Sequence, residues 1–120
     1  RLTRRPVCVD PSHSVGTRGA SPDGIMDMLH GTAQAIVAGA NMVLVDCHPD
    51  PTKALVDGAQ ALRLDELPYV LEDVAIAREA YLRRAQAAST FRAQQYADSL
   101  TACARSRIMV RDLRSVGQSK

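Results

Sequence analysis

The sequence predicts an α/β protein, in which strands of a parallel sheet alternate with helices. Two short apolar runs, 6–10 and 42–46, are rich in valine, and each ends in an aspartate. Apolar residues that follow one another without alternation are typical of parallel strands, since both faces of such strands are covered. Each run precedes a segment whose apolar residues recur with the period of a helix. The order strand, helix, strand, helix is that of two βα units.

The first helix is predicted from Ser21 to Gly39, after a loop over 10–19. Ser21 can cap the helix, Pro22 suits the first helical position, and Asp23 places a carboxylate in the first turn. One helical face then carries Ile25, Met28, Leu29, Ile36 and Val37. Gly39 can adopt the left-handed conformation that ends a helix.

A second helix is predicted to begin at Asp65, after a loop in which Pro49 and Pro51 exclude a continuing strand. Pro68 falls in the first turn, where proline is tolerated. The apolar positions that keep the helical period are Leu67, Val70, Leu71, Val74, Tyr81 and Leu82.

From about residue 86 the pattern changes. Ser89 or Thr90 is expected to cap a third helix, and the polar segment 111–120 is expected to fray. We therefore divide the chain into an α/β part, 1–85, and a helical extension, 86–120.

Composition excludes several classes of protein. The chain has 120 residues, of which 46% are hydrophobic and 23% charged, as in ordinary globular domains. It has neither an apolar run long enough to span a membrane nor a signal-peptide pattern. Three cysteines without a CxxC spacing favour a reducing compartment, so we expect a cytoplasmic protein.

Charge is unevenly distributed along the chain. The formal net charge is +2, but the ends are basic, which leaves a net charge of −5 over 6–91. A nucleic-acid groove needs its positive charge gathered on one folded face. We therefore expect neither nucleic acid nor a membrane as a partner.

Imidazole and carboxylate side chains follow both predicted strands. Asp10 and His13 come after the first strand, and Asp46 and His48 come after the second, with Asp57 in the same loop. Function in α/β folds gathers at the carboxyl ends of the strands. These residue types suit a divalent metal such as Mn, Fe, Co or Zn. The alternative is that the histidines bind loop backbone and the aspartates cap turns.

Two stretches resemble a known family. The first is Pro-Val-Cys-Val-Asp-Pro-Ser-His-Ser over 6–14, followed by Gly16 and Arg18. The second runs over 43–62 and includes Val-Asp-Cys-His-Pro-Asp-Pro-Thr-Lys-Ala-Leu-Val-Asp-Gly, with Ala-Gly-Ala at 38–40 before it. Both resemble the DAHP synthases, in the branch that shares a barrel with 3-deoxy-manno-octulosonate 8-phosphate synthase.

The resemblance covers about 6–85 and implies a fold. It places the two strands as the seventh and eighth of a TIM (β/α)8 barrel, so that the chain would supply the last two βα units and a C-terminal helical extension. The form Asp-Pro-Ser-His at 10–13 favours DAHP synthase over the octulosonate enzyme, which usually reads Asp-Ala-Thr-His.

The resemblance also implies an activity. DAHP synthases condense phosphoenolpyruvate with erythrose 4-phosphate in the first step of the shikimate pathway, which leads to aromatic amino acids. A divalent metal polarises the aldehyde oxygen in most of them. By position, His13 matches a catalytic histidine that is also a metal ligand, and Asp57 matches an aspartate ligand. Asp46 stands where the family has glutamate, one methylene longer by about 1.5 Å.

Several functional groups of the family have no counterpart in the chain. The cysteine ligand of a Gly-Pro-Cys motif and the Lys-Pro-Arg segment that binds phosphate are absent from 1–120. The family's Gly-Arg-Arg reads Gly16-Thr17-Arg18 here, so one cation is lost. Substrate contacts are expected from Arg18, Lys53 and His48, which belong to the same predicted rim.

Three interpretations remain open. The chain can be part of an enzyme, inactive alone because it lacks groups that position the substrates. It can instead be a stand-alone, non-catalytic binding or regulatory protein, oligomeric and with 86–120 covering its strand edges. It can also be an α/β module whose motifs are unused. Association into a homo-oligomer is expected.

Overall fold

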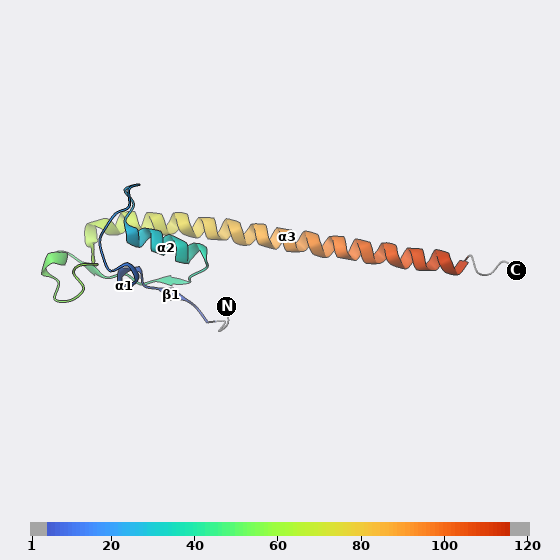
Figure 1. Ribbon diagram of the computed structural model, residues 1–120, viewed down its shortest axis with the longest axis horizontal. Coiled ribbons are helices and arrows are strands. Elements are labelled where there is room, and N and C mark those ends of the chain that lie inside the picture. The colour runs from blue at the N-terminus through green and yellow to red at the C-terminus, as the bar shows by residue number, and fades with distance from the viewer. Residues whose placement is uncertain (1–4, 116–120) are drawn as a thin grey trace. The chain divides into compact units, whose positions relative to one another are not determined.

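The computed structural model describes residues 5–115, with side chains described as far as residue 104 (Figure 1). The chain forms two compact units, Arg1–Arg83 and Arg84–Lys120. The first unit contains the strands, two helices and the beginning of a third. The second unit continues that third helix.

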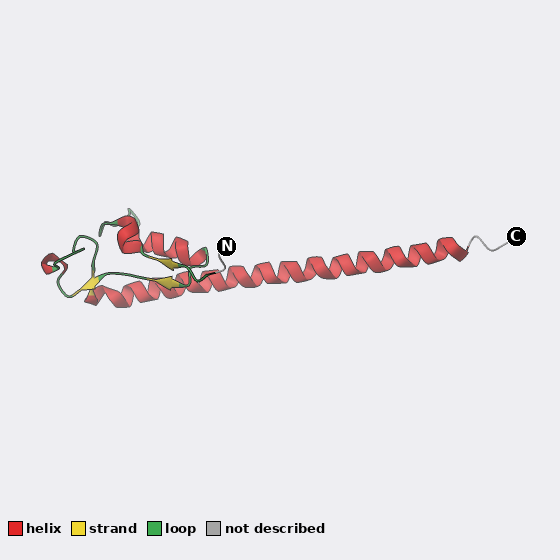
Figure 2. Ribbon diagram, turned by 90° about the horizontal axis from the view of Figure 1, so that it is seen from below, coloured by secondary structure: helices red, strands yellow, loops and turns green. Residues whose placement is uncertain are grey.

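The first unit is built on a parallel β-α-β arrangement, as the sequence predicts. Strand β1 (Cys8–Val9) pairs with strand β2 (Met42–Val43), with Cys8 opposite Met42 and Val9 opposite Val43. Helix α2 (Asp27–Val37) lies between them in the sequence, and Figure 2 shows the short strands as yellow arrows beside it. The helix ends as expected, because Gly39 has a left-handed φ of 99°.

The expected loop over 10–19 contains a short helix, α1 (Pro11–Val15). Asp10 caps this helix by accepting a hydrogen bond from the backbone N–H of His13, and Pro11 occupies the first helical position. Gly16 ends it with a φ of 73°. The run Asp-Pro-Ser-His therefore contains its own cap and helix start, which the loop prediction overlooked.

The start of α2 corrects a second expectation, because the helix begins at Asp27 and not at Ser21. Ser21 instead opens a turn, in which its carbonyl accepts from the N–H of Gly24 (2.9 Å) and its N–H donates to the carbonyl of Ile25 (2.9 Å). Gly24 has a φ of 84°, a conformation that interrupts a helix. The Ser-Pro-Asp signal thus begins a turn. The Ser21 hydroxyl donates a hydrogen bond to the carboxylate of Asp27, the residue at which α2 begins.

Two further strands lie in the segment expected to be loop. Strand β3 (Cys47–His48) pairs in parallel with strand β4 (Leu62–Arg63), and Cys47 lies opposite Leu62. Between them, Pro51–Lys53 form a turn of 3₁₀ helix. A second such turn, Leu64–Glu66, leads into the third helix.

Helix α3 (Leu67–Ser115) runs without the break expected at Ser89 or Thr90. Thr90 donates its hydroxyl to the carbonyl of Gln86 (3.1 Å), which is the bond of a residue inside a helix and not of a cap. The helix also includes 111–115, which were expected to fray, whereas 116–120 lie outside the described residues. No helix in the described part of the chain is both long and apolar enough to cross a membrane.

The apolar core of the first unit joins its two longer helices to strand β4. It consists of Met28 and Leu29 from α2, Leu62 from β4 and Val70 from α3, each at most 4% exposed. The first turn of α3, with Leu67 and Val70, thereby packs against the core residues of α2. Val15, at the end of α1, and Val45, which follows β2, pack against this core.

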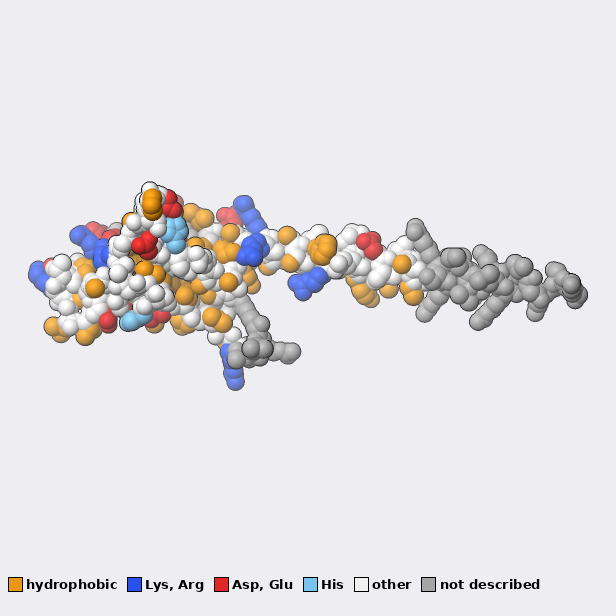
Figure 3. Space-filling view, in the orientation of Figure 1, with side chains coloured by type: hydrophobic (Ala, Val, Ile, Leu, Met, Phe, Trp, Pro, Cys, Tyr) orange, Lys and Arg blue, Asp and Glu red, His pale blue; other side chains and the backbone are white. Residues whose placement is uncertain are grey.

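Apolar surface nevertheless remains exposed on this unit, as the orange side chains in Figure 3 show. A groove of about 420 Å³ lies beside β2 and the first turns of α3. Its apolar lining includes Ile36, Met42, Val43, Val45, Val70 and Val74. Within the described residues the β1–β2 sheet has only these two strands.

Candidate metal centre

His13 is held at the carboxyl end of β1 by the cap of helix α1. One carboxylate oxygen of Asp10, Oδ1, accepts the backbone N–H of His13 at 3.1 Å. The other, Oδ2, lies 3.0 Å from Nδ1 of the His13 ring. A single carboxylate therefore fixes both the backbone and the ring of this histidine.

Asp46 follows strand β2, and hydrogen bonds of its backbone N–H and carbonyl hold it in place. Its N–H donates to the hydroxyl of Ser12 (3.1 Å), and its carbonyl accepts from the N–H of Leu62 (2.8 Å). Ser12 is only 1% exposed, so this bond is shielded from water. The residue beside His13 thus ties Asp46 to helix α1.

Asp57 lies in the loop between β3 and β4, in an unusual backbone conformation. Its φ of 57° is left-handed, the one such non-glycine value among the described residues. Backbone outliers of this kind gather at functional sites, where surrounding structure maintains them. Gly58 follows because a Cβ at that position would collide with the carbonyl oxygen of Pro51.

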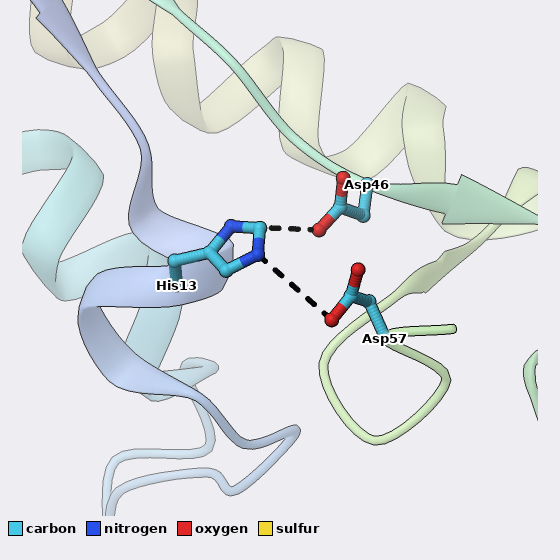
Figure 4. Close-up of side chains that lie close together, drawn as sticks. All are labelled: His13, Asp46 and Asp57. Carbon is cyan, nitrogen blue, oxygen red and sulfur yellow. Dashed lines mark ion pairs between the residues drawn. The ribbon is translucent and has the colours of Figure 1, made fainter.

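These three residues converge, as Figure 4 shows. Asp46 Oδ2 lies 3.7 Å from His13 Nδ1, and Asp57 Oδ1 lies 3.9 Å from His13 Nε2. One ligand atom from each residue lies within 4.8 Å of the others, close enough to surround one ion. The sequence expected His13, Asp46 and Asp57 to act together, and the structure brings them together. Their role as metal ligands stays a prediction.

The donor set fits a divalent metal. One imidazole and two carboxylates are the ligands that suit Mn, Fe, Co and Zn, and three protein ligands leave positions for substrate. Asp46 Oδ2 is buried and has no hydrogen-bond partner. A buried carboxylate oxygen without a partner needs an explanation, and a cation beside it supplies one.

Electrostatics in the cluster favour a positively charged neighbour. The hydrogen bond of the His13 ring to the Asp10 carboxylate and the charge of Asp10 raise the pKa of His13, desolvation opposes them, and the charges of Asp46 and Asp57 add smaller increases. The backbone hydrogen bond from His13 lowers the pKa of Asp10. The three carboxylates around one imidazole therefore stabilise a cation, whether a proton or a metal ion.

The expected substrate residues lie apart from this cluster. Arg18 donates to the carbonyl of Ala61 and, at 2.6 Å, to Glu66 Oε1. Lys53 pairs with Asp50 at 2.8 Å, and its side chain is 79% exposed. His48 accepts the N–H of Asp50 through Nδ1 at 3.0 Å. Each has a protein partner, and contact with a substrate stays a prediction for all three.

Two residues shape the site in ways that the sequence does not predict. Asp10 is expected as a carboxylate of the metal-binding rim or as a turn cap, and Ser12 only as part of a loop. For Asp10 a sequence signal exists, because it stands three residues before His13. An N-cap side chain accepts a hydrogen bond from the backbone N–H at that spacing. Cys8 and Cys47 do not join the cluster.

The fold and the cluster define an α/β protein with a candidate metal centre at the carboxyl ends of parallel strands. Residues 1–81 match the model of the DAHP synthetase I family. The chain belongs to this family.

Relatives of known function agree with that membership. The 2-dehydro-3-deoxyphosphooctonate aldolase of Nitratidesulfovibrio vulgaris (strain DP4) is 42% identical over 73 residues, which are 58% of this chain and 27% of the relative. The enzyme of the same name from Legionella pneumophila (strain Corby) is 38% identical over 86 residues, 68% of this chain and 31% of the relative.

Among solved structures, DAHP synthase from Thermotoga maritima matches with a TM-score of 0.52 and 35% identity. The match covers 62% of this chain and 20% of the enzyme, which is a TIM barrel. The chain thus spans about a quarter of the length of the relatives that it matches.

Proposed function

We propose that the chain supplies the last two βα units, strands seven and eight, of a DAHP-synthase-like barrel. The observation that carries the proposal is the convergence of His13, Asp46 and Asp57 beside the ends of parallel strands. In TIM barrels the active site lies at this end of the strands, where loops from different units meet. Here β1 and β2 correspond to the seventh and eighth strands.

In this role the three residues would hold a divalent metal. When bound, the metal supplies Lewis-acid polarisation of the aldehyde oxygen of a sugar phosphate. His13 contributes a neutral nitrogen, while Asp46 and Asp57 contribute negative charge. Asp46 replaces the longer glutamate of the family, and its bond to Ser12 supports a ligand role by holding it 3.7 Å from the His13 ring.

The reaction that we propose is condensation of phosphoenolpyruvate with erythrose 4-phosphate, with release of phosphate. The motif Asp-Pro-Ser-His at 10–13 supports this choice, as do the DAHP synthases among the solved structures. The runner-up follows from the octonate aldolases among the relatives. An eight-carbon acid less the three carbons of pyruvate leaves a pentose phosphate as the alternative aldose.

We further propose that the isolated chain is inactive and needs the rest of a barrel. The share of the relatives that it spans supports this proposal, as do the two-stranded sheet and the apolar groove beside β2. Strands of a complementing portion would pair with the free edges of β1 and β2. Catalysis would then draw the remaining ligand and the phosphate-binding cations from that portion.

Metal titration tests the centre itself. Calorimetric titration with Mn²⁺, Co²⁺ and Zn²⁺ should give one site in the chain, and His13→Ala should abolish it. His30→Ala is the matched control, because His30 pairs with Asp23 outside the cluster. Equal binding by the His13→Ala variant and the unsubstituted chain would rule out the proposed ligand set.

Turnover tests the reaction. The chain alone should release no phosphate from phosphoenolpyruvate and erythrose 4-phosphate. Mixed with the N-terminal portion of the Thermotoga enzyme, cut before its matching segment, it should release phosphate in a metal-dependent manner. Faster turnover with a pentose phosphate would replace the proposed aldose by the runner-up.

A non-catalytic, self-associating protein is the second candidate. It is supported by the apolar side chains Met42, Leu71 and Ile76, which are each at least 60% exposed. Under this candidate the exposed surface is covered by another copy of the chain. Sedimentation would then show a stable oligomer that stays intact when the complementing portion is added. The first proposal predicts instead that any oligomer of the chain gives way to a complex with that portion.

A further inference from the structure

We propose that Asp10 is a positioning residue, which fixes the ring tautomer of His13 and presents its Nε2 atom to the metal. The inference rests on the proposed metal centre for its second half. Its first half, the tautomer, concerns the chain alone.

The carboxylate of Asp10 is itself rigidly placed. Oδ1 accepts the N–H of His13, and the Asp10 carbonyl accepts both the N–H and the hydroxyl of Ser14 (3.1 and 2.6 Å). These bonds belong to the capped first turn of α1. The remaining oxygen, Oδ2, is therefore held against the His13 ring and not free to rotate away.

The distance decides which ring nitrogen carries the proton. Asp10 Oδ2 lies 3.0 Å from Nδ1, within hydrogen-bond range, whereas Asp46 Oδ2 lies 3.7 Å from the same atom, beyond it. A carboxylate only accepts hydrogen bonds, so a neutral His13 must donate its proton from Nδ1. Nε2 then keeps a lone pair, on the side of the ring that faces Asp57.

This arrangement matches the way in which proteins orient metal-binding histidines. A ligating imidazole usually donates its other N–H to a carboxylate or carbonyl, which fixes the ring and raises its basicity. Asp10 therefore acts through His13 and does not itself belong to the three converging ligands.

The two other histidines of the chain have the opposite arrangement. His48 accepts the N–H of Asp50 through Nδ1 at 3.0 Å, which leaves the proton on Nε2. His30 donates from Nε2 to Asp23 Oδ2 at 3.2 Å. His13 alone of the three has a carboxylate on Nδ1, so one spectrum of the chain contains its own reference signals.

The test replaces Asp10 in two ways. In Asp10→Asn the amide oxygen still caps α1, but the amide N–H₂ faces Nδ1 and can only donate to it. The tautomer of His13 should therefore invert while the helix stays capped. Asp10→Ala removes the cap as well. Asp50→Asn is the matched control, since the Asp50 carboxylate also caps a turn but contacts Thr52 and Lys53 and not His13.

Long-range ¹H–¹⁵N spectra at a pH where the imidazoles are neutral report the tautomers directly. We expect Nδ1–H for His13 in the unsubstituted chain and in Asp50→Asn, and Nε2–H in Asp10→Asn. Zn²⁺ affinity should fall about 10–100-fold in Asp10→Asn and stay unchanged in Asp50→Asn. Circular dichroism of each variant checks that the fold is kept.

Three results would overturn the inference. An unchanged tautomer in Asp10→Asn shows that Asp10 only caps the helix. An inverted tautomer with unchanged Zn²⁺ affinity shows that Nε2 is not the ligand. An Nδ1–H tautomer in an unsubstituted chain that binds no metal would refute the proposed function, and with it the presentation of Nε2.

Discussion

The Ser12 hydroxyl accepts a hydrogen bond from the backbone N–H of Asp46, 34 residues away in the sequence (3.1 Å). This bond connects the turn that carries His13 to the segment that carries Asp46. The relative positions of two of the three candidate ligands therefore depend on one buried serine.

Ser12→Ala removes the acceptor and leaves the Asp46 N–H without it. We expect the free energy of unfolding to fall by about 1–3 kcal/mol, because a shielded donor loses its partner. Urea unfolding measures the change. Ser14→Ala is the control, because the bond from the Ser14 hydroxyl to the Asp10 carbonyl is exposed and water can replace it, so its loss should cost less than about 0.5 kcal/mol. Equal losses in the two variants would contradict the role of Ser12.

Substitutions of Asp46 test its proposed role as a metal ligand. Asp46→Asn keeps the volume of the side chain but removes its charge. It should weaken Co²⁺ binding by more than about 10-fold, which is the smallest loss usual when a residue that only supports a ligand is replaced. Asp46→Glu introduces the longer carboxylate that the resemblance implies at this position, and should bind at least as tightly as the unsubstituted chain. Calorimetric titration distinguishes the two, and the opposite order would exclude Asp46 as a ligand.

Gly58 tests the loop that carries Asp57. A Cβ there would overlap the backbone carbonyl of Pro51, so Gly58→Ala should cost about 1–3 kcal/mol and displace Asp57. Gly31→Ala is the matched control. Gly31 lies inside helix α2, and its added Cβ would meet the Val15 side chain at an ordinary 3.7 Å. The substitution should therefore be neutral or stabilise the fold by up to about 1 kcal/mol. Thermal unfolding and metal affinity report the two effects.

Stability should fall in acid partly through Glu66. Burial acts to raise its pKa, but the hydrogen bonds from Arg18 and from the Arg63 N–H outweigh burial and lower the pKa of Glu66. A lowered pKa means that the stabilisation is present above the unfolded value and is lost as the pH falls through the folded one. Glu66→Gln should therefore flatten the acid side of a plot of melting temperature against pH.

Glu79→Gln serves as the control for that measurement. Glu79 pairs with Arg83 on the exposed surface of α3, where an ion pair contributes little. The Glu79→Gln variant should therefore have the same acid side of the plot as the unsubstituted chain. If Glu66→Gln gave the same plot as the unsubstituted chain, the ion pair of Glu66 with Arg18 would not link stability to pH.

Sequence reasoning succeeded where a local signal and a general rule of the fold agree. Two valine-rich runs predict parallel strands, and the ends of parallel strands lie at one edge, so His13 and Asp46 were expected to meet. It was wrong at the start of α2, because Ser-Pro-Asp is a signal for a turn as well as for a helix. Gly24 decided between the two by ending the turn before Asp27.

The remaining features depend on pairing across long stretches of chain. Strands β3 and β4 have two residues each, too few for a periodic signal, and the bond from the Leu62 N–H to the Asp46 carbonyl joins them at their start. The bond from Asp46 to Ser12 is of the same kind. No local pattern near either partner indicates which distant group it meets.

The pairing of β3 with β4 also determines what a cut in the chain would do. Leu55 and Val56 lie in the loop that this pairing closes at its base, and they are 100% and 75% exposed. A protease that cleaves between them would leave two fragments joined by the strand ladder. His13 and Asp46 would then lie on one fragment and Asp57 on the other, so that a bound ion would bridge two separate polypeptides.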